Sequence, residues 1–180
     1  MRSPVLTGAA GLVLVAAGYA SAGPERVAFP NGYDTAWIKY TVVERPDRKI
    51  VRNMYVNPEA HAKAKAGEPI PDGTVLIMED MKVKLDASGN PELGSTGRFV
   101  PTGEVIAIFV MEKRHGWGEA VPADERNGDW DYSSFAPDGI VRPNLNTSGC
   151  FACHMSRSGE RDFTFTYAKV LLDQGKRGAS

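Results

Sequence analysis

The sequence predicts an α+β protein in which an antiparallel β-sheet is flanked by a few helices. Five segments alternate apolar and polar residues or are rich in β-branched and aromatic side chains, which is typical of strands. Turn residues separate them, and only short stretches have a helical composition. We expect the strands at 37–44, 49–56, 74–85, 104–113 and, less regular than the others, 130–135.

The connections between the strands carry their own signals. Pro46-Asp47 predicts a turn, so the first two strands should form an antiparallel hairpin. Asn57-Pro58-Glu59 supplies a capping side chain, a proline at the first helical position and an acid in the first turn, so a short helix should follow, stopped at Gly67. Two further helices are expected at 145–153 and 167–174, and the Gly- and Pro-rich stretches 86–102 and 116–128 should be loops.

The N-terminus has the pattern of an export signal. Arg2 precedes an apolar run over 5–17, and Ala20-Ser21-Ala22 offers the small residues read by signal peptidase. The run is short for a membrane span, although an uncleaved anchor is the alternative. We expect a signal peptide at 1–22 and one domain at 23–180. The net charge of -1 argues against a nucleic-acid or anionic-membrane partner.

The only two cysteines stand in Cys150-Phe151-Ala152-Cys153-His154, near the C-terminal end. This spacing is typical of covalent haem c attachment, with thioethers to Cys150 and Cys153 and the imidazole of His154 on the iron. One haem c is therefore the predicted cofactor, and attachment outside the cytoplasm fits the export signal. A thioredoxin-like dithiol would need a βαβ context, and a zinc site would have only His61 and His115 to complete it.

Four further segments carry a family resemblance. They are Val51-Arg52-Asn53-Met54-Tyr55-Val56 running into Pro58-Glu59, Pro71-Asp72-Gly73-Thr74-Val75-Leu76-Ile77, Asn127-Gly128-Asp129-Trp130, and Asp162-Phe163-Thr164-Phe165 after the haem motif. In this order the chain resembles the cytochrome P-460 and cytochrome c-prime-beta superfamily. The resemblance implies an antiparallel sheet flanked by helices, usually in a homodimer. One branch oxidises hydroxylamine at a lysine-crosslinked haem, and the other binds nitric oxide or carbon monoxide at an uncrosslinked haem.

Met78 stands where the resemblance places the crosslinking lysine, when 58–79 are aligned without gaps. Methionine has no amine for this bond, so the usual crosslink should be absent and Met78 should lie beside the haem. Its thioether is also a possible sixth iron ligand, although core filling is the simpler expectation. Lys82 and Lys84 share the strand face of Met78, but Lys82 is about 13 Å further along. It would reach the haem only through a register slip or a bulge, so both lysines are expected in solvent.

Other residues are weaker candidates for the open face of the haem. An apolar wall would favour an uncharged diatomic molecule over water or anions. Candidates for this wall are Trp37, Tyr40, Phe99, Phe109 and Trp130, with Phe109 expected rather in the sheet core. Glu79, Asp80, Asp129 and Asp131 are available as a base for hydroxylamine oxidation, but nothing in the sequence ties any one of them to the haem. Met54, Met81 and Met111 are expected as core, His61 and His115 at the surface, and Phe163 and Phe165 as structural support.

We therefore predict an exported, periplasmic monohaem c-type cytochrome with an open or weakly closed distal site that binds nitric oxide or a related small nitrogen species. The first alternative is a haem enzyme that oxidises hydroxylamine or reduces peroxide, and the second is an electron carrier with a sixth protein ligand. The missing lysine favours the binding of nitric oxide or a related species over the enzyme. Expected partners are a small diatomic or hydroxylamine-like ligand, a periplasmic electron-transfer protein and a second copy of the chain, with no membrane contact after signal cleavage.

Overall fold

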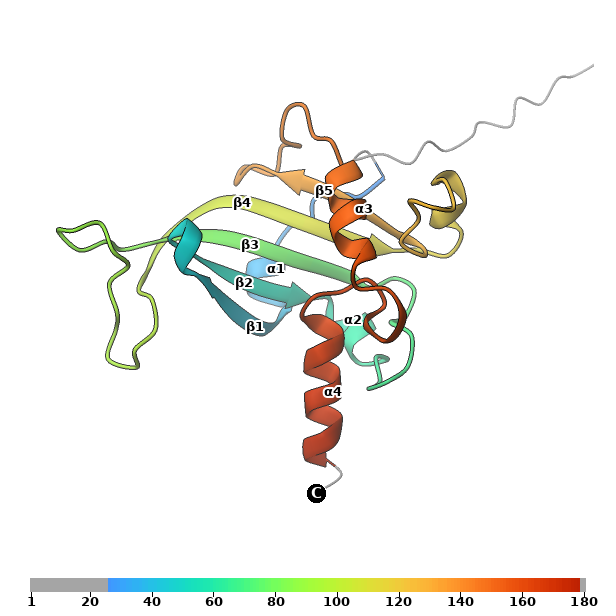
Figure 1. Ribbon diagram of the computed structural model, residues 1–180, viewed down its shortest axis with the longest axis horizontal. Helices are drawn as coiled ribbons and strands as arrows, with labels where there is room; N and C mark the ends of the chain where they lie inside the picture. Colours follow the sequence, from blue (N-terminus) through green and yellow to red (C-terminus); the bar gives the residue numbers. More distant parts are fainter. Residues whose placement is uncertain (1–25, 179–180) are drawn as a thin grey trace, which may run out of the picture.

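A computed structural model describes residues 26–178, and the expected signal peptide lies outside them. Within these residues one five-stranded sheet has the order β1-β2-β3-β4-β5, and every neighbouring pair is antiparallel (Figure 1). The strands are β1 (Ile38–Arg45), β2 (Ile50–Val56), β3 (Val75–Val83), β4 (Pro101–Lys113) and β5 (Trp130–Phe135). The predicted α+β class and all five strands are confirmed.

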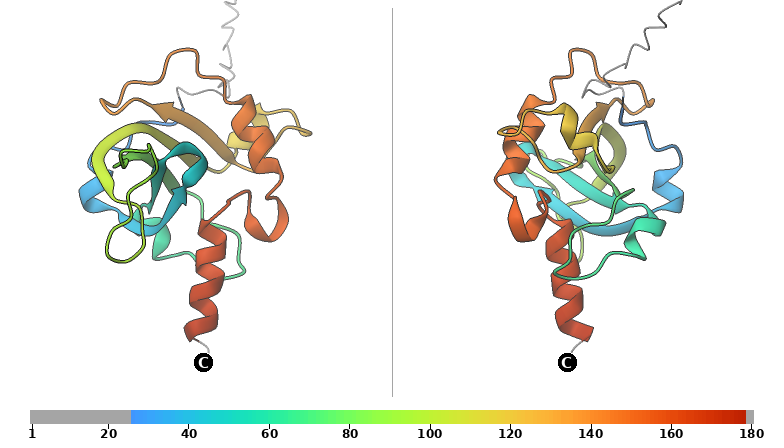
Figure 2. Two further views of the ribbon diagram at one scale, coloured as in Figure 1. Left: turned by 60° about the vertical axis from the view of Figure 1, so that its left-hand side comes forward. Right: turned by 90° about the vertical axis from the view of Figure 1, so that its right-hand side faces the viewer.

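Helices cover both faces of this sheet. They are α1 (Tyr33–Ala36), α2 (Pro58–His61), α3 (Ser148–Met155) and α4 (Tyr167–Gly178), with single 3₁₀ turns η1 (Pro46–Arg48), η2 (Trp117–Ala120) and η3 (Gly159–Arg161). Figure 2 shows α3 and α4 on one side of the sheet and α1 on the other. Among residues 26–178, none of the helices has the length and apolar character needed to span a bilayer.

The helix boundaries differ from the predictions. The helix after Asn57 ends at His61 and not before Gly67, because regular i→i−4 hydrogen bonding gives way to a mixture of α- and 3₁₀-type bonds. The amide of Lys63 donates to the carbonyl of Ala60 at 3.1 Å, and the amide of Ala64 donates to the carbonyls of Ala60 and His61 at 3.0 and 3.2 Å. The helix of the Cys-X-X-Cys-His motif begins three residues later than expected, at Ser148, and α4 runs on to Gly178. Strand β4 begins at Pro101, inside a predicted loop, and α1 was not predicted.

Successive side chains of a strand point to opposite faces of the sheet, so each face has its own core. On β2, for example, Tyr55 packs on the α1 side and Val56 on the side of α3 and α4. The core on the α3 and α4 side is the larger and contains Val56, Ile70, Leu76, Met111, Val121, Trp130, Tyr132, Phe151, Tyr167, Ala168 and Leu171. The other contains Val27, Tyr33, Tyr55, Ile77, Ile108, Val110 and Phe135.

Strand register arranges the α3 face into three rows. The row nearest α3 is Val56, Leu76, Met111 and Tyr132, the middle row is Met54, Met78 and Phe109, and the far row pairs Arg52 with Asp80. Successive rows are two residues apart, about 6.6 Å along each strand. This face therefore changes from aromatic and aliphatic to charged along its length, and it forms the floor of the candidate site.

Candidate functional site

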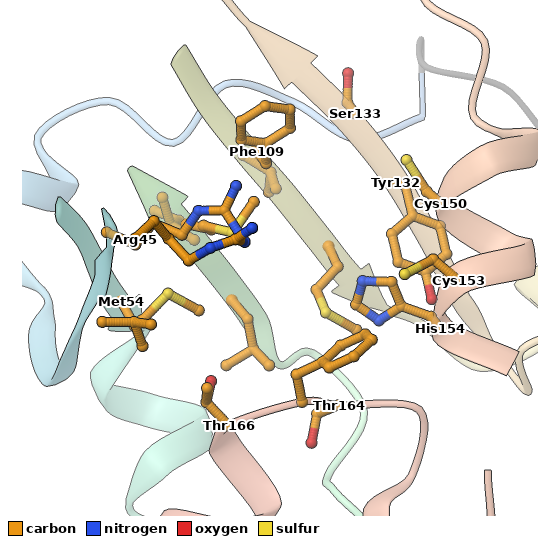
Figure 3. Close-up of a pocket in the computed structure, with 18 of the residues that line it drawn as sticks. Arg45, Met54, Phe109, Tyr132, Ser133, Cys150, Cys153, His154, Thr164 and Thr166 are labelled. Carbon is orange, nitrogen blue, oxygen red and sulfur yellow. The ribbon is translucent and has the colours of Figure 1, made fainter. Parts of the chain in front are cut away.

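A cavity of about 780 Å³ lies between the α3 face of the sheet and the segment that carries α3 (Figure 3). Its volume is within the range of about 300–1,000 Å³ that is usual for cofactor and ligand sites. Cys150, Cys153 and His154 line one side, and Met78 lies on the sheet floor. The structure thus brings all four predicted cofactor residues to one cavity.

Helix geometry explains how the motif faces the cavity. Cys150, Cys153 and His154 are three and four residues apart, so they share one face of α3. Phe151 does not line the cavity and packs edge-on against Tyr132, with ring centroids 4.8 Å apart. The buried amide of Asn127 fixes the helix in this orientation, because its Nδ2 donates to the Phe151 carbonyl at 3.0 Å and to the Tyr132 hydroxyl at 2.9 Å.

The imidazole of His154 is held in one orientation. Its Nδ1 lies 2.6 Å from the carbonyl oxygen of Phe163, and donation to that oxygen leaves Nε2 unprotonated and available to a metal. The rings of Tyr132 and Phe165 flank it, with centroids at 4.9 and 5.1 Å. Burial lowers the pKa of His154, although the hydrogen bond to Phe163 opposes this, so the imidazole is in the neutral form that ligates iron.

The carbonyl that orients His154 sits on an anchored turn. Asp162 and Phe163 have φ angles of 43° and 59°, in the left-handed region that non-glycine residues seldom occupy. The Asp162 carboxylate accepts hydrogen bonds from Lys113 Nζ at 2.8 Å, from the Ile70 amide at 2.9 Å and from Trp130 Nε1 at 3.3 Å. Phe163 therefore has the supporting role that the sequence predicted, whereas Phe165 lines the cavity beside His154.

The two thiols match haem attachment better than redox exchange. Both are free, and burial raises the pKa of Cys150, whereas redox-active Cys-X-X-Cys pairs have a lowered thiol pKa. In the described part of the chain no group of three or more His, Cys, Asp or Glu side chains is placed to hold a metal ion. Two thiols, one oriented neutral imidazole and a largely apolar cavity are a donor set that fits haem c.

The predicted aromatic wall is only partly at the cavity. Tyr40 and Phe109 line it, so placing Phe109 in the sheet core was wrong. Trp130 is fully buried in the same core as Tyr132, and Trp37 packs against the core of the opposite face. Phe99 lies within the long β3–β4 connection, where its amide donates to Glu44. Strand alternation identified the apolar positions but not which of the two cores each would join.

None of the four predicted acids is among the side chains that line the cavity within the described residues. Glu79 is buried on the opposite face, where it accepts hydrogen bonds from Tyr33 at 2.5 Å and Asn53 at 2.7 Å. The others are engaged as follows: Asp80 with Arg52, Asp131 with Arg26, and Asp129 with the Gly118 amide.

Lys82 and Lys84 are both exposed, as predicted. The ammonium of Lys82 lies 2.6 Å from the Glu104 carboxylate. The β3–β4 pairing is irregular after Asp80, but the extra residues are on β4, and the β2–β3 register is continuous from Lys82 to Leu76. Strand β3 therefore has neither the slip nor the bulge that Lys82 would need to replace a lysine at position 78.

The methionines and histidines divide between expected and unexpected positions. Met54 and Met111 line the cavity beside Met78, and Met111 also belongs to the core. His115 is exposed, as predicted. His61 is half-buried, with Nδ1 3.0 Å from the Tyr167 hydroxyl, so its placement at the surface was wrong.

Sequence reasoning missed three arginines that line the cavity: Arg45, Arg48 and Arg52. A signal for one of them was present, since Arg52 stands two residues from Met54 and shares its strand face. The position of the other two depends on how the hairpin at η1 folds over the sheet, which alternation does not reveal.

Comparison with known proteins agrees with this architecture. The model of the family described as Cytochrome P460 matches residues 30–166, a range that includes all five strands and α3. No curated protein matches the chain significantly. Because the match covers most of the chain, including the cavity and its Cys-X-X-Cys-His motif, the chain belongs to the cytochrome P460 family, and this membership implies a haem cofactor.

Proposed function

We propose that this chain is an exported monohaem c-type cytochrome that binds nitric oxide or a related small nitrogen species on the open side of its haem. The observation that supports this best is the convergence of Cys150, Cys153 and the oriented His154 on one cavity of about 780 Å³. In this proposal the two cysteines tether one haem c, and Nε2 of His154 is the proximal ligand.

Each wall of the cavity has a defined task in this proposal. The Phe163 carbonyl fixes the plane and tautomer of His154 and increases its basicity as a ligand. Met54, Met78 and Phe109 give the floor an apolar middle row that excludes water. When bound, the haem iron supplies the coordination position that a diatomic ligand takes up.

Ligand binding is supported better than hydroxylamine oxidation. Met78 occupies the position that the family resemblance gives to the crosslinking lysine, and no lysine is among the described side chains that line the cavity. Oxidation of hydroxylamine also needs a base near the substrate. None of the four acids considered for this task lines the cavity, and each is already paired with another group, Asp80 with Arg52 at the far end of the cavity.

One observation favours electron transfer as a second candidate function. Three thioethers, those of Met54, Met78 and Met111, line the cavity. A methionine sulfur is a common sixth haem ligand and raises the reduction potential. If Met54 or Met78 closes the sixth position, its replacement by alanine converts a six-coordinate low-spin spectrum into a five-coordinate high-spin one. If neither is a ligand, both variants keep the spectrum of the wild type.

The deciding experiment is the optical spectrum of the purified ferrous holoprotein with and without nitric oxide. A high-spin haem c spectrum that changes on addition of the gas supports the proposal. A six-coordinate low-spin spectrum in both oxidation states, unchanged by the gas, contradicts it in favour of electron transfer. A Soret band shifted far to the red would reveal a lysine crosslink and contradict the argument from Met78.

Export and assembly complete the proposal. We place the mature protein in the periplasm after removal of residues 1–22, where it exchanges electrons with a periplasmic partner and forms a homodimer. The mass of the protein recovered from a periplasmic fraction tests the first point, because cleavage leaves a chain that begins near Gly23. Light scattering of the eluted holoprotein gives its oligomeric state.

A further inference from the structure

Three arginines gather at the end of the cavity that lies furthest from the haem motif. Arg45 ends β1, Arg48 ends η1 and Arg52 lies on β2, and all three line the cavity. We call them the arginine end. Arg52 is four residues from Val56 in the row nearest α3, about 13 Å along the strand. Figure 3 accordingly shows Arg45 on the opposite side of the cavity from His154, with Met54 beside Arg45.

The arginine end carries more positive than negative charge. Arg52 donates two hydrogen bonds to the Asp80 carboxylate, at 2.8 and 3.4 Å, and the two side chains are only 14% and 2% exposed. Arg45 makes a similar two-point contact with Asp47. Arg48 is left with a contact of 4.0 Å to the already paired Asp80. Among residues 26–178, two carboxylates thus pair with three guanidinium groups, which leaves one positive charge.

The remaining walls offer this charge no carboxylate. Apart from the arginines and the haem motif, the described lining side chains are apolar or bear hydroxyl groups. A cation beside a largely apolar cavity attracts an anion more strongly than one in open solvent, because the local dielectric constant is lower. A guanidinium group also presents a planar pair of donors that matches two oxygens of one anion.

We propose that the arginine end binds an anionic two-oxygen group, with Arg48 as the main donor and Arg45 as the second. This inference rests on the proposed haem-binding function and adds to it a preference for anions, which an apolar wall would not have. Two anions could supply such a two-oxygen group. The group is either a free oxyanion such as nitrite that enters the cavity, or a propionate carboxylate of the haem itself.

Arg48→Gln and Arg45→Gln are the informative variants, because both side chains are partly exposed and neither belongs to the buried pair. Arg52→Gln is avoided, since it would leave Asp80 buried without its partner. Arg98→Gln is the matched control. Arg98 is 55% exposed, close to the 53% of Arg48, and it pairs with Glu44 outside the cavity lining.

Nitrite binding to each ferric holoprotein is measured by titration calorimetry, with imidazole as an uncharged probe. If the anion is free, Arg48→Gln weakens nitrite binding about tenfold, Arg45→Gln weakens it less, and imidazole binding stays within about twofold. If the haem propionate is the anion, nitrite affinity is unchanged, and the propionate bending band in the resonance Raman spectrum shifts in Arg48→Gln but not in Arg98→Gln. If neither readout differs from the control, the proposal is overturned.

This test is separate from that of the proposed function. Calorimetry detects nitrite at the arginine end whether or not the iron has an open position. Failure of the ferrous protein to bind nitric oxide would therefore overturn the proposed function alone. Normal nitric oxide binding together with unaltered nitrite affinity and Raman bands in Arg48→Gln would overturn only the role of the arginines.

Discussion

His154 Nδ1 lies 2.6 Å from the carbonyl oxygen of Phe163, so the histidine is oriented by backbone only nine residues further along the chain. The intervening segment returns to α3 because Asp162 and Phe163 both adopt left-handed φ angles. Such conformations are costly and persist only where surrounding contacts impose them. Here the contacts are those of the Asp162 carboxylate with Lys113, Ile70 and Trp130.

Asp162→Asn should therefore destabilise the protein without changing the size of the side chain. It removes the charge that pairs with Lys113 at 2.8 Å in a mostly buried setting, and we expect a loss of about 2 kcal/mol in the free energy of unfolding. Urea unfolding of the holoprotein measures it. Asp173→Asn is the control, because its pair with Lys169 is on the surface and its loss should change little. Equal effects of the two variants would contradict an anchoring role for Asp162.

The fold was more predictable than the site, and the residues show why. Alternation in β2 and β3 depends only on the period of a strand, so all five strands could be placed from local sequence. Local sequence does not show whether an apolar residue will line the cavity or pack in one of the two cores. The placements of Phe109 and Trp37 were wrong for that reason. The cavity needs α3, η1 and the sheet together, so Arg48 was not recognisable. His61 was misplaced because its partner, Tyr167, is 106 residues away.

Loss of both cysteines should abolish covalent haem retention. Cys150→Ala and Cys153→Ala each leave one thiol at the cavity, so each single variant should keep part of its haem through acid extraction, and the double variant none. His154→Ala should retain covalently bound haem and lose the axial imidazole, which its optical spectrum would show. Met155→Ala, outside the cavity lining, is the control. Haem that survives extraction in the double variant would contradict thioether attachment.

Asn127→Ala should loosen the helix that carries the haem motif. The amide of Asn127 is fully buried and bridges the Tyr132 hydroxyl and the Phe151 carbonyl, both of which would lose a buried donor. We expect the free energy of unfolding to fall by about 1–3 kcal/mol, measured by urea titration. Asn90→Ala, at an exposed position in the β3–β4 connection, is the matched control and should have a much smaller effect. Two equal losses would show that the Asn127 bridge contributes nothing specific.

Strong alkali should destabilise the fold through its buried tyrosines. Burial raises the pKa of Tyr33, Tyr40, Tyr55, Tyr132 and Tyr167, and that of Tyr167 reaches about 12. A tyrosine in the unfolded chain loses its proton near pH 10, whereas the folded protein keeps it, so the unfolded state binds fewer protons above that pH. The stabilisation is complete below about pH 10 and is lost as the pH rises toward the folded pKa.

Tyr167→Phe isolates the contribution of one tyrosine to this alkaline destabilisation. Between about pH 10 and pH 12, the folded state retains the Tyr167 proton that the unfolded state has lost. This difference of one proton makes the free energy of unfolding fall by up to about 1.4 kcal/mol per pH unit. The variant should therefore show a shallower fall than the wild type in this window, even though it also loses the contact with His61 and starts from a lower value. Urea unfolding at a series of alkaline pH values gives both slopes. Identical slopes would mean that Tyr167 titrates alike in the folded and unfolded chains, which would contradict its raised pKa.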